Sequence, residues 1–268
     1  MITYPFTYSR AKSLSDAAAQ IAANPDAKIL AGGQTLIPTM KQRLASPAAL
    51  IDISSLDELA FIRTSGDALV VGAGTKHADV AASDEVKKAI PALAYLAGEI
   101  GDPAVRHMGT IGGSLANNDP AADYPAAALG LGATIKTTGR EIAVDDFFTG
   151  MFETALEDGE IISEISFPRP EKAGYAKFPN PASRYAMVGV FVAKTKSGVR
   201  VAVTGAAPCV FRLPEMEAAL GANFTPDAAA GVAISPDDLN SDLHGSAEYR
   251  AHLVTVMAKR AVAAANGS

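Results

Sequence analysis

Two segments of this chain place adjacent glycines among small polar residues, a pattern suited to binding an anion through the backbone. Residues 109–125 read GTIGGSLANNDPAADYP and hold three glycines, two asparagines, two aspartates and two prolines in 17 positions. Residues 30–38 read LAGGQTLIP and carry a second glycine pair. Because glycine lacks a Cβ and reaches positive φ, a ligand can approach its backbone closely. Free N–H groups in a turn or at the start of a helix can then hold phosphate oxygens.

Glycine pairs also occur in ordinary turns, so one pair alone does not indicate a ligand. Here two such loops are each expected to join a strand or apolar segment to a helix. Together they can hold the two phosphates of a dinucleotide, which would let an acidic chain bind an anion without a lysine cluster. The residues alone therefore leave two readings open, structural turns or a dinucleotide site.

Other nucleotide-binding motifs fail when they are compared residue by residue. The stretch VGAGTKH begins like GxGxxG, but His77 stands where the third glycine should be. The stretch beginning at Gly130 fails in the same way, with Ile135 in that position, and no GxxxxGK[ST] occurs. A Rossmann NAD site or a P-loop is therefore disfavoured.

The cysteine and histidine content argues against nucleophilic or metal chemistry in this chain. Cys209 is the single cysteine and lies among apolar residues, so we expect a small buried side chain rather than a nucleophile. One cysteine cannot hold an iron–sulfur cluster of the all-cysteine kind. The four histidines show no metal-ligand spacing. We therefore predict no cysteine nucleophile and no metal site.

Composition narrows the class of protein further. The 268 residues are 49% hydrophobic and 19% charged, with a formal net charge of -6, which argues against disorder. No Lys/Arg cluster is present, so nucleic-acid binding is not expected. The N-terminus lacks the apolar region of a signal peptide. The longest apolar run, residues 124–135, is shorter than the roughly 20 residues of a membrane-spanning helix. A soluble cytoplasmic protein is predicted.

The first half of the chain alternates short strands with helices, the pattern of α/β or α+β layers. Ser13 followed by Asp16 predicts a capped helix start. The predicted strands cover residues 28–31, 50–53 and 69–71. The predicted helices cover residues 13–23, 36–44 and 86–98, with another starting near residue 76.

A change of pattern near residue 170 marks a candidate domain boundary. Pro168, Pro170, Pro179 and Pro181 cluster there around a charged turn. Residues 187–195 and 199–205 then predict a β-hairpin, and residues 215–220 and 247–264 predict helices. We expect an α+β domain of about a hundred residues at the end of the chain.

Both glycine segments, in this order, resemble a known family. LAGGQTLIPTMKQRL and DPAVRHMGTIGGSLANNDPAADYPAAALGLGA resemble the two FAD-pyrophosphate loops of the FAD-binding medium subunits of molybdenum hydroxylases. This family includes the flavoproteins of aerobic carbon monoxide dehydrogenase and xanthine dehydrogenase. FTYSRAKSLSDA, GEIISEISFP, ASRYAMVGVFVA and TGAAP extend the resemblance over nearly the whole chain.

The resemblance implies an α+β fold. A two-subdomain α/β FAD-binding domain of the PCMH type would cover residues 1–170, with subdomains of about 1–55 and 56–170. A smaller α+β C-terminal domain would cover residues 171–268.

The resemblance also implies which residues hold FAD. The two loops would clasp the pyrophosphate, Ile100 would make an apolar contact, Asn117 and Asp123 would bond the ribityl chain or nearby polar atoms, and Tyr185 would lie against the isoalloxazine. The predicted loop residues are Ala31, Gly32, Gly33, Gln34, Thr35 and Leu36 in the first loop and Thr110, Ile111, Gly112, Gly113 and Ser114 in the second.

Structural alternatives exist for several of these residues. Tyr185 also fits a partly buried strand tyrosine, and Asp123 also fits the N-cap of a helix starting at Tyr124. Asp119 also fits a turn. For Lys177 and Arg184, we expect a solvated surface role.

The resemblance finally implies partners and an electron route. FAD would do the redox chemistry while the protein binds and orients it, so the resemblance implies no catalytic acid–base residue in this chain. A large partner subunit would hold the molybdenum–molybdopterin cofactor, and a small partner would hold two [2Fe–2S] clusters. Electrons would pass through those clusters to FAD and then to an external acceptor. A dimer of heterotrimers, that is a heterohexamer, is expected.

One departure from the family pattern concerns the substrate. Some carbon monoxide dehydrogenases carry His-Ser after the first glycine pair, where this chain has Gln34-Thr35. The difference leaves FAD binding possible and weakens any assignment of carbon monoxide as the substrate. Two other classes stay open, a stand-alone flavin-dependent oxidoreductase and a non-enzymatic nucleotide-binding protein.

Overall fold

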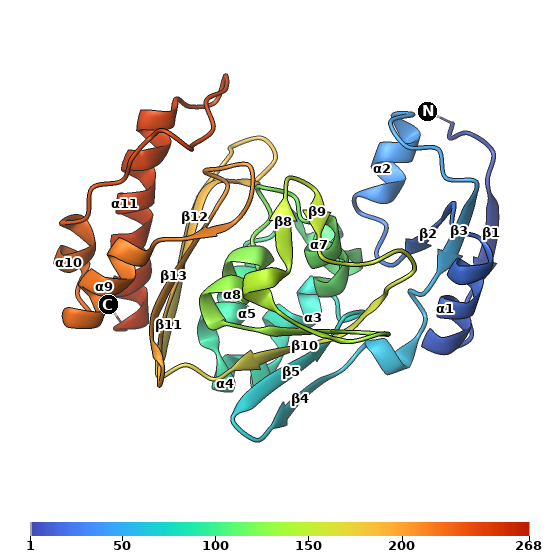
Figure 1. The fold of residues 1–268 in the computed structure, drawn as a ribbon, viewed down its shortest axis with the longest axis horizontal. Helices are drawn as coiled ribbons and strands as arrows, with labels where there is room; N and C mark the ends of the chain where they lie inside the picture. The colour runs from blue at the N-terminus through green and yellow to red at the C-terminus, as the bar shows by residue number, and fades with distance from the viewer. Residues whose placement is uncertain (1, 268) are drawn as a thin grey trace.

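The computed structural model describes residues 2–267, in which three consecutive parts of the chain each build their own sheet. In Figure 1 the N-terminal part lies at the right in blue, the central part lies in the middle, and the C-terminal part lies at the left in orange. Helices cover each sheet, so the α+β class predicted from the sequence is confirmed.

The N-terminal part is a parallel sheet in the order β1-β3-β2, packed against a capped helix. The Ser13 side chain accepts a hydrogen bond from the Asp16 N–H at 3.0 Å, as the capping pattern predicts. Ala17 and Ile21 bury one face of that helix. The elements are β1 (Thr7–Arg10), α1 (Leu14–Ala23), β2 (Ala27–Leu30), α2 (Leu36–Lys41) and β3 (Ala49–Asp52).

The central part is a five-stranded antiparallel sheet in the order β4-β5-β10-β6-β7. Its strands are β4 (Ile62–Ser65), β5 (Ala68–Gly72), β6 (Thr134–Thr137), β7 (Glu141–Ala143) and β10 (Ile162–Pro168). Its helices are α3 (His77–Ala82), α4 (Asp84–Ala89), α5 (Pro91–Gly98), α6 (Pro103–Met108), α7 (Ile111–Asn117) and α8 (Tyr124–Leu131), with 3-10 turns at Asp57–Leu59 and Val144–Asp146. The strands β8 (Phe148–Gly150) and β9 (Glu153–Thr154) form a small hairpin beside them.

Two predicted helix lengths are wrong. Residues 86–98 form parts of α4 and α5 rather than one helix, because Ile90 leaves the helical region (φ -144°, ψ 78°). The residue before a proline is disfavoured in the helical conformation, and Pro91 follows Ile90. The helix predicted over residues 36–44 ends at Lys41, and Arg43 has a positive φ of 63°.

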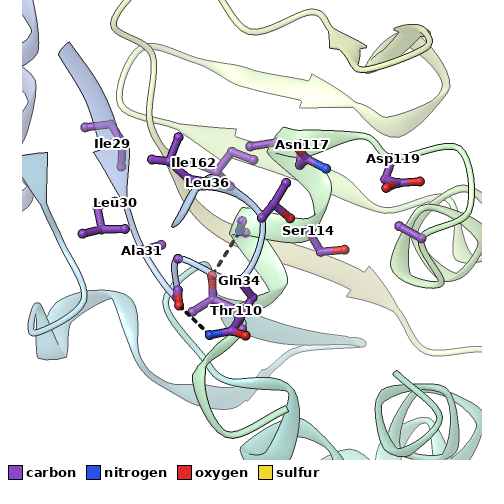
Figure 2. Close-up of a pocket in the computed structure, with 18 of the residues that line it drawn as sticks. Ile29, Leu30, Ala31, Gln34, Leu36, Thr110, Ser114, Asn117, Asp119 and Ile162 are labelled. Atoms are coloured by element: carbon purple, nitrogen blue, oxygen red, sulfur yellow. Dashed lines mark hydrogen bonds between the residues drawn. The ribbon is translucent and has the colours of Figure 1, made fainter. Parts of the chain in front are cut away.

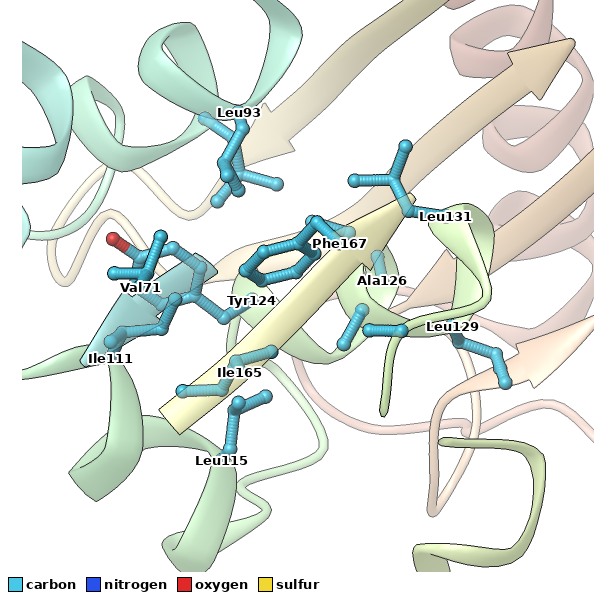
Figure 3. Close-up of a cluster of buried hydrophobic side chains, with 14 of the residues drawn as sticks. Val71, Leu93, Ile111, Leu115, Tyr124, Ala126, Leu129, Leu131, Ile165 and Phe167 are labelled. Atoms are coloured by element: carbon cyan, nitrogen blue, oxygen red, sulfur yellow. The ribbon is translucent and has the colours of Figure 1, made fainter. Parts of the chain in front are cut away.

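The apolar run at residues 124–135 forms a buried core helix and the strand that follows it. Every residue of α8 is buried. Figure 3 shows Tyr124 and Leu131 from this helix close to Ile165 and Phe167 of β10. On its other side α8 packs against the C-terminal sheet, where Gly130 lies on Phe191. A helix enclosed on all sides has no amphipathic pattern, which explains its uniform apolar sequence. Across residues 2–267, no helix is long and apolar enough to cross a bilayer.

The C-terminal part is an antiparallel sheet in the order β11-β12-β13-β14, covered on one face by the long last helix. The predicted hairpin is confirmed, because β12 and β13 pair from Gly189↔Thr204 to Thr195↔Gly198. The predicted terminal helix is also confirmed. The elements are β11 (Lys172–Pro179), β12 (Ala186–Thr195), β13 (Gly198–Thr204), β14 (Phe211–Arg212), α9 (Pro214–Ala222), α10 (Pro226–Ala230) and α11 (Ala247–Ala265).

The contact between β11 and α11 depends on a glycine. A Cβ at Gly174 would overlap the carbonyl oxygen of Ala261 and would lie 2.8 Å from the Ala265 nitrogen. We expect Gly174→Ala to push the helix off the sheet and to lower the free energy of unfolding by about 1–3 kcal/mol, the usual cost of overpacking.

Urea unfolding followed by circular dichroism measures this loss. Gly221→Ala is the matched control, because a Cβ at Gly221 in α9 meets no atom within 4 Å. The control should be neutral or slightly stabilising, since alanine is the better helix former. Equal stability of the two variants would contradict the assigned contact.

Candidate functional site

A large cavity lies between the N-terminal and central parts. Its volume is about 870 Å³, within the range of pockets that hold cofactors. The first glycine loop, the second glycine loop, the segment Leu156–Ile162 and residues 182–185 line it. Figure 2 shows Leu36, Ser114 and Asn117 around this space, with Ile29 and Leu30 from β2 on one side.

The two glycine loops touch each other where Gly32 and Gly109 line the cavity. A Cβ at Gly32 would overlap the Met108 carbonyl oxygen and would lie 2.8 Å from the Gly109 Cα. A Cβ at Gly109 would lie 2.6 Å from the Nε2 of His77. Only bare backbone fits at this crossing, so the glycines bring together segments about 75 residues apart in the chain.

The first loop lines the cavity with residues whose backbone N–H groups make no hydrogen bond among the described residues. Within residues 2–267, no hydrogen bond uses the N–H groups of Gly33, Gln34, Thr35 and Leu36. Gly33 has a φ of 68°, a left-handed conformation that glycine adopts without strain. The Gln34 side chain folds back on the Gly32 carbonyl at 3.4 Å (Figure 2). Four consecutive N–H groups without a partner among the described residues form a site suited to an anion.

The second loop differs from the expectation of bare N–H groups. The N–H groups of Ile111 and Gly112 donate to Thr75 and Ala73 carbonyl oxygens at 3.1 and 2.9 Å. The Gly113 N–H donates to the Thr110 hydroxyl at 3.2 Å (Figure 2). The first two bonds dock α7 onto the residues that follow β5, and the third caps α7. The second loop therefore offers mainly side chains to the cavity.

The cavity brings together nearly all of the sequence-predicted site residues. Ile111 is the exception, because its side chain is fully buried in the core of the central part (Figure 3). The predicted residues that line the cavity are Ala31, Gly32, Gly33, Gln34, Thr35, Leu36, Ile100, Thr110, Gly112, Gly113, Ser114, Asn117, Asp123 and Tyr185.

Asp123, which lines the cavity, belongs to a buried ion pair with Lys177. The Asp123 carboxylate accepts hydrogen bonds from the Tyr175 hydroxyl at 2.5 Å and from the Lys177 ammonium at 3.1 Å. Lys177 also donates to the Glu99 carbonyl at 2.8 Å. Burial raises the pKa of Asp123, which Lys177 and Tyr175 oppose.

At this ion pair the surface role expected for Lys177 is wrong, and the N-cap alternative for Asp123 holds for its position only. The Lys177 side chain is only 2% exposed, so it does not point into solvent. Asp123 does hold the N-cap position of α8, which begins at Tyr124, but its side chain makes no cap hydrogen bond, because its oxygens bind Lys177 and Tyr175 of β11 instead.

Asp119, Arg184 and Tyr185 lie at the cavity as exposed or partly exposed residues. Asp119 is a turn residue, because its carboxylate accepts the Ala121 N–H at 2.9 Å, and burial raises its pKa. Tyr185 precedes β12 rather than lying within the strand, and it is 47% exposed. Arg184 is exposed, as expected.

His77 lines the cavity but was not among the predicted residues. It is 5% exposed, and its Nδ1 atom has no hydrogen-bond partner in the described part of the chain. Burial, followed by the charge of Arg106, lowers its pKa from 6.5 to about 4. In the sequence, His77 stands out only as the residue in the third-glycine position of the failed GxGxxG match. That pattern gives no signal that the imidazole is buried beside the cavity.

Comparison with known proteins gives matches over both halves of the chain. The model "FAD binding domain in molybdopterin dehydrogenase" matches residues 4–170. The model "CO dehydrogenase flavoprotein C-terminal domain" matches residues 173–265.

Full-length relatives agree with these models. The chain is 35% identical to the nicotine 6-hydroxylase medium subunit of Paenarthrobacter nicotinovorans, covering 95% of each chain. It is 37% identical to the carbon monoxide dehydrogenase medium chain of Hydrogenophaga pseudoflava, covering 99% of this chain and 98% of the relative. A solved structure of the Hydrogenophaga pseudoflava carbon monoxide dehydrogenase superposes with a TM-score of 0.90 at 37% identity, over 100% of this chain and 99% of the other.

The buried imidazole of His77 predicts a dependence of stability on pH. Its pKa is depressed in the folded state, so the unfolded chain binds the proton more tightly, and stability falls as pH drops from about 6.5 towards about 4. This difference in pKa between the unfolded and folded states corresponds to about 3 kcal/mol of unfolding free energy. Urea unfolding across this range should show a smaller loss in His77→Gln. The exposed His252→Gln control should behave like the parent, and an unchanged profile in His77→Gln would contradict the prediction.

The buried ion pair predicts a second stability effect. Lys177→Met leaves the Asp123 carboxylate buried without its cation, which should cost about 3–5 kcal/mol near neutral pH. Because burial raises the pKa of Asp123, the difference in free energy of unfolding between the parent and Lys177→Met should shrink in acid, where the carboxyl group is protonated.

The matched control is Lys196→Met, which removes the exposed ion pair with Asp67 and should cost about 0–1 kcal/mol. Unfolding in urea at neutral and acidic pH measures both variants. If Lys177→Met loses no more unfolding free energy than the Lys196→Met control, the Lys177–Asp123 pair is not effectively buried.

Proposed function

Because the chain belongs to the family of FAD-binding subunits of molybdopterin dehydrogenases, we propose that it binds FAD in the cavity between its N-terminal and central parts. The two family models together match most of the chain. Its relatives are subunits of dehydrogenases and hydroxylases, so the chain is an oxidoreductase flavoprotein subunit.

The observation that carries the proposal is the row of free N–H groups in the first loop. A dinucleotide diphosphate needs several donors within a short distance, and Gly33, Gln34, Thr35 and Leu36 supply them on the cavity wall. The side chains of Ser114 and Asn117 add polar groups from the facing loop (Figure 2). Backbone N–H groups can bind an anion whatever the net charge of the protein, so this site is compatible with a formal charge of -6.

The other residues of the cavity support an extended ligand. We assign the pyrophosphate to the crossing of the two loops, with the ribityl chain near Asn117 and Asp123. The isoalloxazine would contact Ile100 and Tyr185, both of which line the cavity. The proposal also divides the chain into an FAD-binding domain over residues 1–170, with subdomains of about 1–55 and 56–170, and a C-terminal domain over residues 171–268.

The proposed role is electron transfer within a larger complex. FAD, when bound, supplies a centre that takes up electrons and passes them on. Two [2Fe–2S] clusters in a small partner subunit would deliver the electrons, and a large partner would hold the molybdenum cofactor. An external acceptor would receive them. The single cysteine supports placing the clusters in a partner. A cytoplasmic dimer of heterotrimers completes the proposal.

The names of the relatives do not single out one substrate for this chain. Medium subunits named for nicotine hydroxylation and for carbon monoxide oxidation are 35% and 37% identical to this chain, nearly the same value. Gln34-Thr35 in the first loop gives no support to carbon monoxide in particular. Substrate choice is therefore assigned to the large partner.

The crossing of the two loops tests FAD binding. Gly32→Ala places a Cβ against the Met108 carbonyl, so the first loop must move away from the second. We expect the variant to lose FAD, measured as the ratio of flavin absorbance to protein after purification and after incubation with excess FAD. Gly98→Ala is the matched control, because its Cβ meets no atom within 4 Å, and it should retain FAD.

Circular dichroism of both variants shows whether the fold is intact. A folded Gly32→Ala chain that holds FAD like the control would contradict the site assignment. A parent chain that binds no FAD under any of these conditions would contradict the proposed function itself.

A further inference from the structure

The loop that carries Tyr185 to the cavity joins β11 to β12 and is closed by its own hydrogen bonds. Its residues 180–185 read NPASRY. Ala182, Ser183, Arg184 and Tyr185 all line the cavity, whereas Asn180 does not. The residue that closes the loop is therefore distinct from the residues that face a ligand.

Asn180 makes most of these hydrogen bonds. Its side-chain Oδ1 accepts the N–H groups of Ala182 and Ser183 at 2.9 and 3.2 Å. Its backbone N–H donates to the Tyr185 carbonyl at 2.8 Å, and its carbonyl accepts the Arg184 N–H at 2.9 Å. The Ser183 hydroxyl in turn accepts the Tyr185 N–H at 3.3 Å. Both ends of the loop are thus bound to one residue.

The backbone around Asn180 also needs this support. Pro179 and Pro181 fix φ on both sides of the residue. Arg184 has a φ of 62°, a left-handed conformation that is costly for a residue with a Cβ. Such a conformation persists only where the surrounding bonds hold it. Beyond the loop, the Ala186 N–H donates to the Ala121 carbonyl at 3.3 Å, which ties the start of β12 to the second glycine loop.

We propose that Asn180 is the positioning residue for Tyr185, fixing the phenol ring in the cavity wall where the isoalloxazine of FAD would lie. The inference rests on the proposed function for the identity of the ligand. The positioning itself rests on the hydrogen bonds of the loop. The loop depends on Oδ1 as a hydrogen-bond acceptor. Aspartate at position 180 keeps such an acceptor and should hold Tyr185 in place, whereas alanine should not.

The loop is exposed, so water can replace the lost partners and the fold should survive the change. Asn180→Ala should raise the population of conformers in which Tyr185 has left the wall by roughly ten-fold, given the modest net strength of two exposed hydrogen bonds. Because the effect is local, circular dichroism should be unchanged while the environment of Tyr185 changes.

Fluorine NMR of the full chain labelled with 3-fluorotyrosine tests this directly. The Tyr185 line is assigned by its absence in Tyr185→Phe. In Asn180→Ala we expect that line to shift towards the position of an unstructured tyrosine, and in Asn180→Asp we expect it at the parent position. Asn223→Ala is the matched control, because Asn223 is exposed and its side chain makes no hydrogen bond in the described chain.

The outcomes of this experiment separate the positioning of Tyr185 by Asn180 from the binding of FAD in the cavity. An Asn180→Ala line at the parent position, or an Asn180→Asp line displaced like that of alanine, would overturn the positioning role. Adding FAD should shift the Tyr185 line of the parent, and a bound flavin that leaves it unmoved would overturn the ring contact. Failure of the parent to bind FAD would overturn the proposed function, while the comparison of Asn180 variants without ligand would still decide the positioning role.

Discussion

The crossing of Gly32 with Met108 and Gly109 is the constraint on which the rest of the site depends. At this point two backbones approach without any side chain between them, and a single added Cβ would separate them. The contact fixes the N-terminal sheet against the central part, and the cavity is the space left beside it. In the second loop the N–H groups of Ile111 and Gly112 donate to Thr75 and Ala73, whereas in the first loop the N–H groups of residues 33–36 have no partner among the described residues.

The C-terminal sheet holds the far side of the same loop. The Thr204 hydroxyl donates to the Ala122 carbonyl at 2.6 Å, and the Gly205 N–H donates to the Pro120 carbonyl at 2.8 Å. Arg250 of α11 is buried and donates to the Met187 and Gly205 carbonyls at 2.7 and 3.0 Å. The last helix therefore supports the ends of β12 and β13 that hold the second loop. A part of the chain far from the first glycine loop thus shapes the opposite wall of the cavity.

The sequence was sufficient for features set by local chemistry. The glycine pairs, the cap at Ser13 and the hairpin between β12 and β13 all depend on residues close together in the chain. The break between α4 and α5 is local too, because Pro91 signals it, although the apolar periodicity of residues 86–98 predicts one continuous helix. Features set by distant partners could not be derived this way. Lys177 looks like a surface residue until the fold places it against Asp123, 54 positions away. The occupied N–H groups of Ile111 and Gly112 likewise depend on carbonyls of a distant strand end.

The position of the cavity has a consequence for the free protein. Its two walls come from separate parts of the chain, whose direct contacts include the glycine crossing and the side chains around Leu59 and Ile161. A ligand that touches both walls adds its binding free energy to their association, and by mass action it stabilises the closed arrangement in proportion to the logarithm of its concentration. A cofactor bound there would then act as a structural component that holds the two parts together, as well as a redox centre.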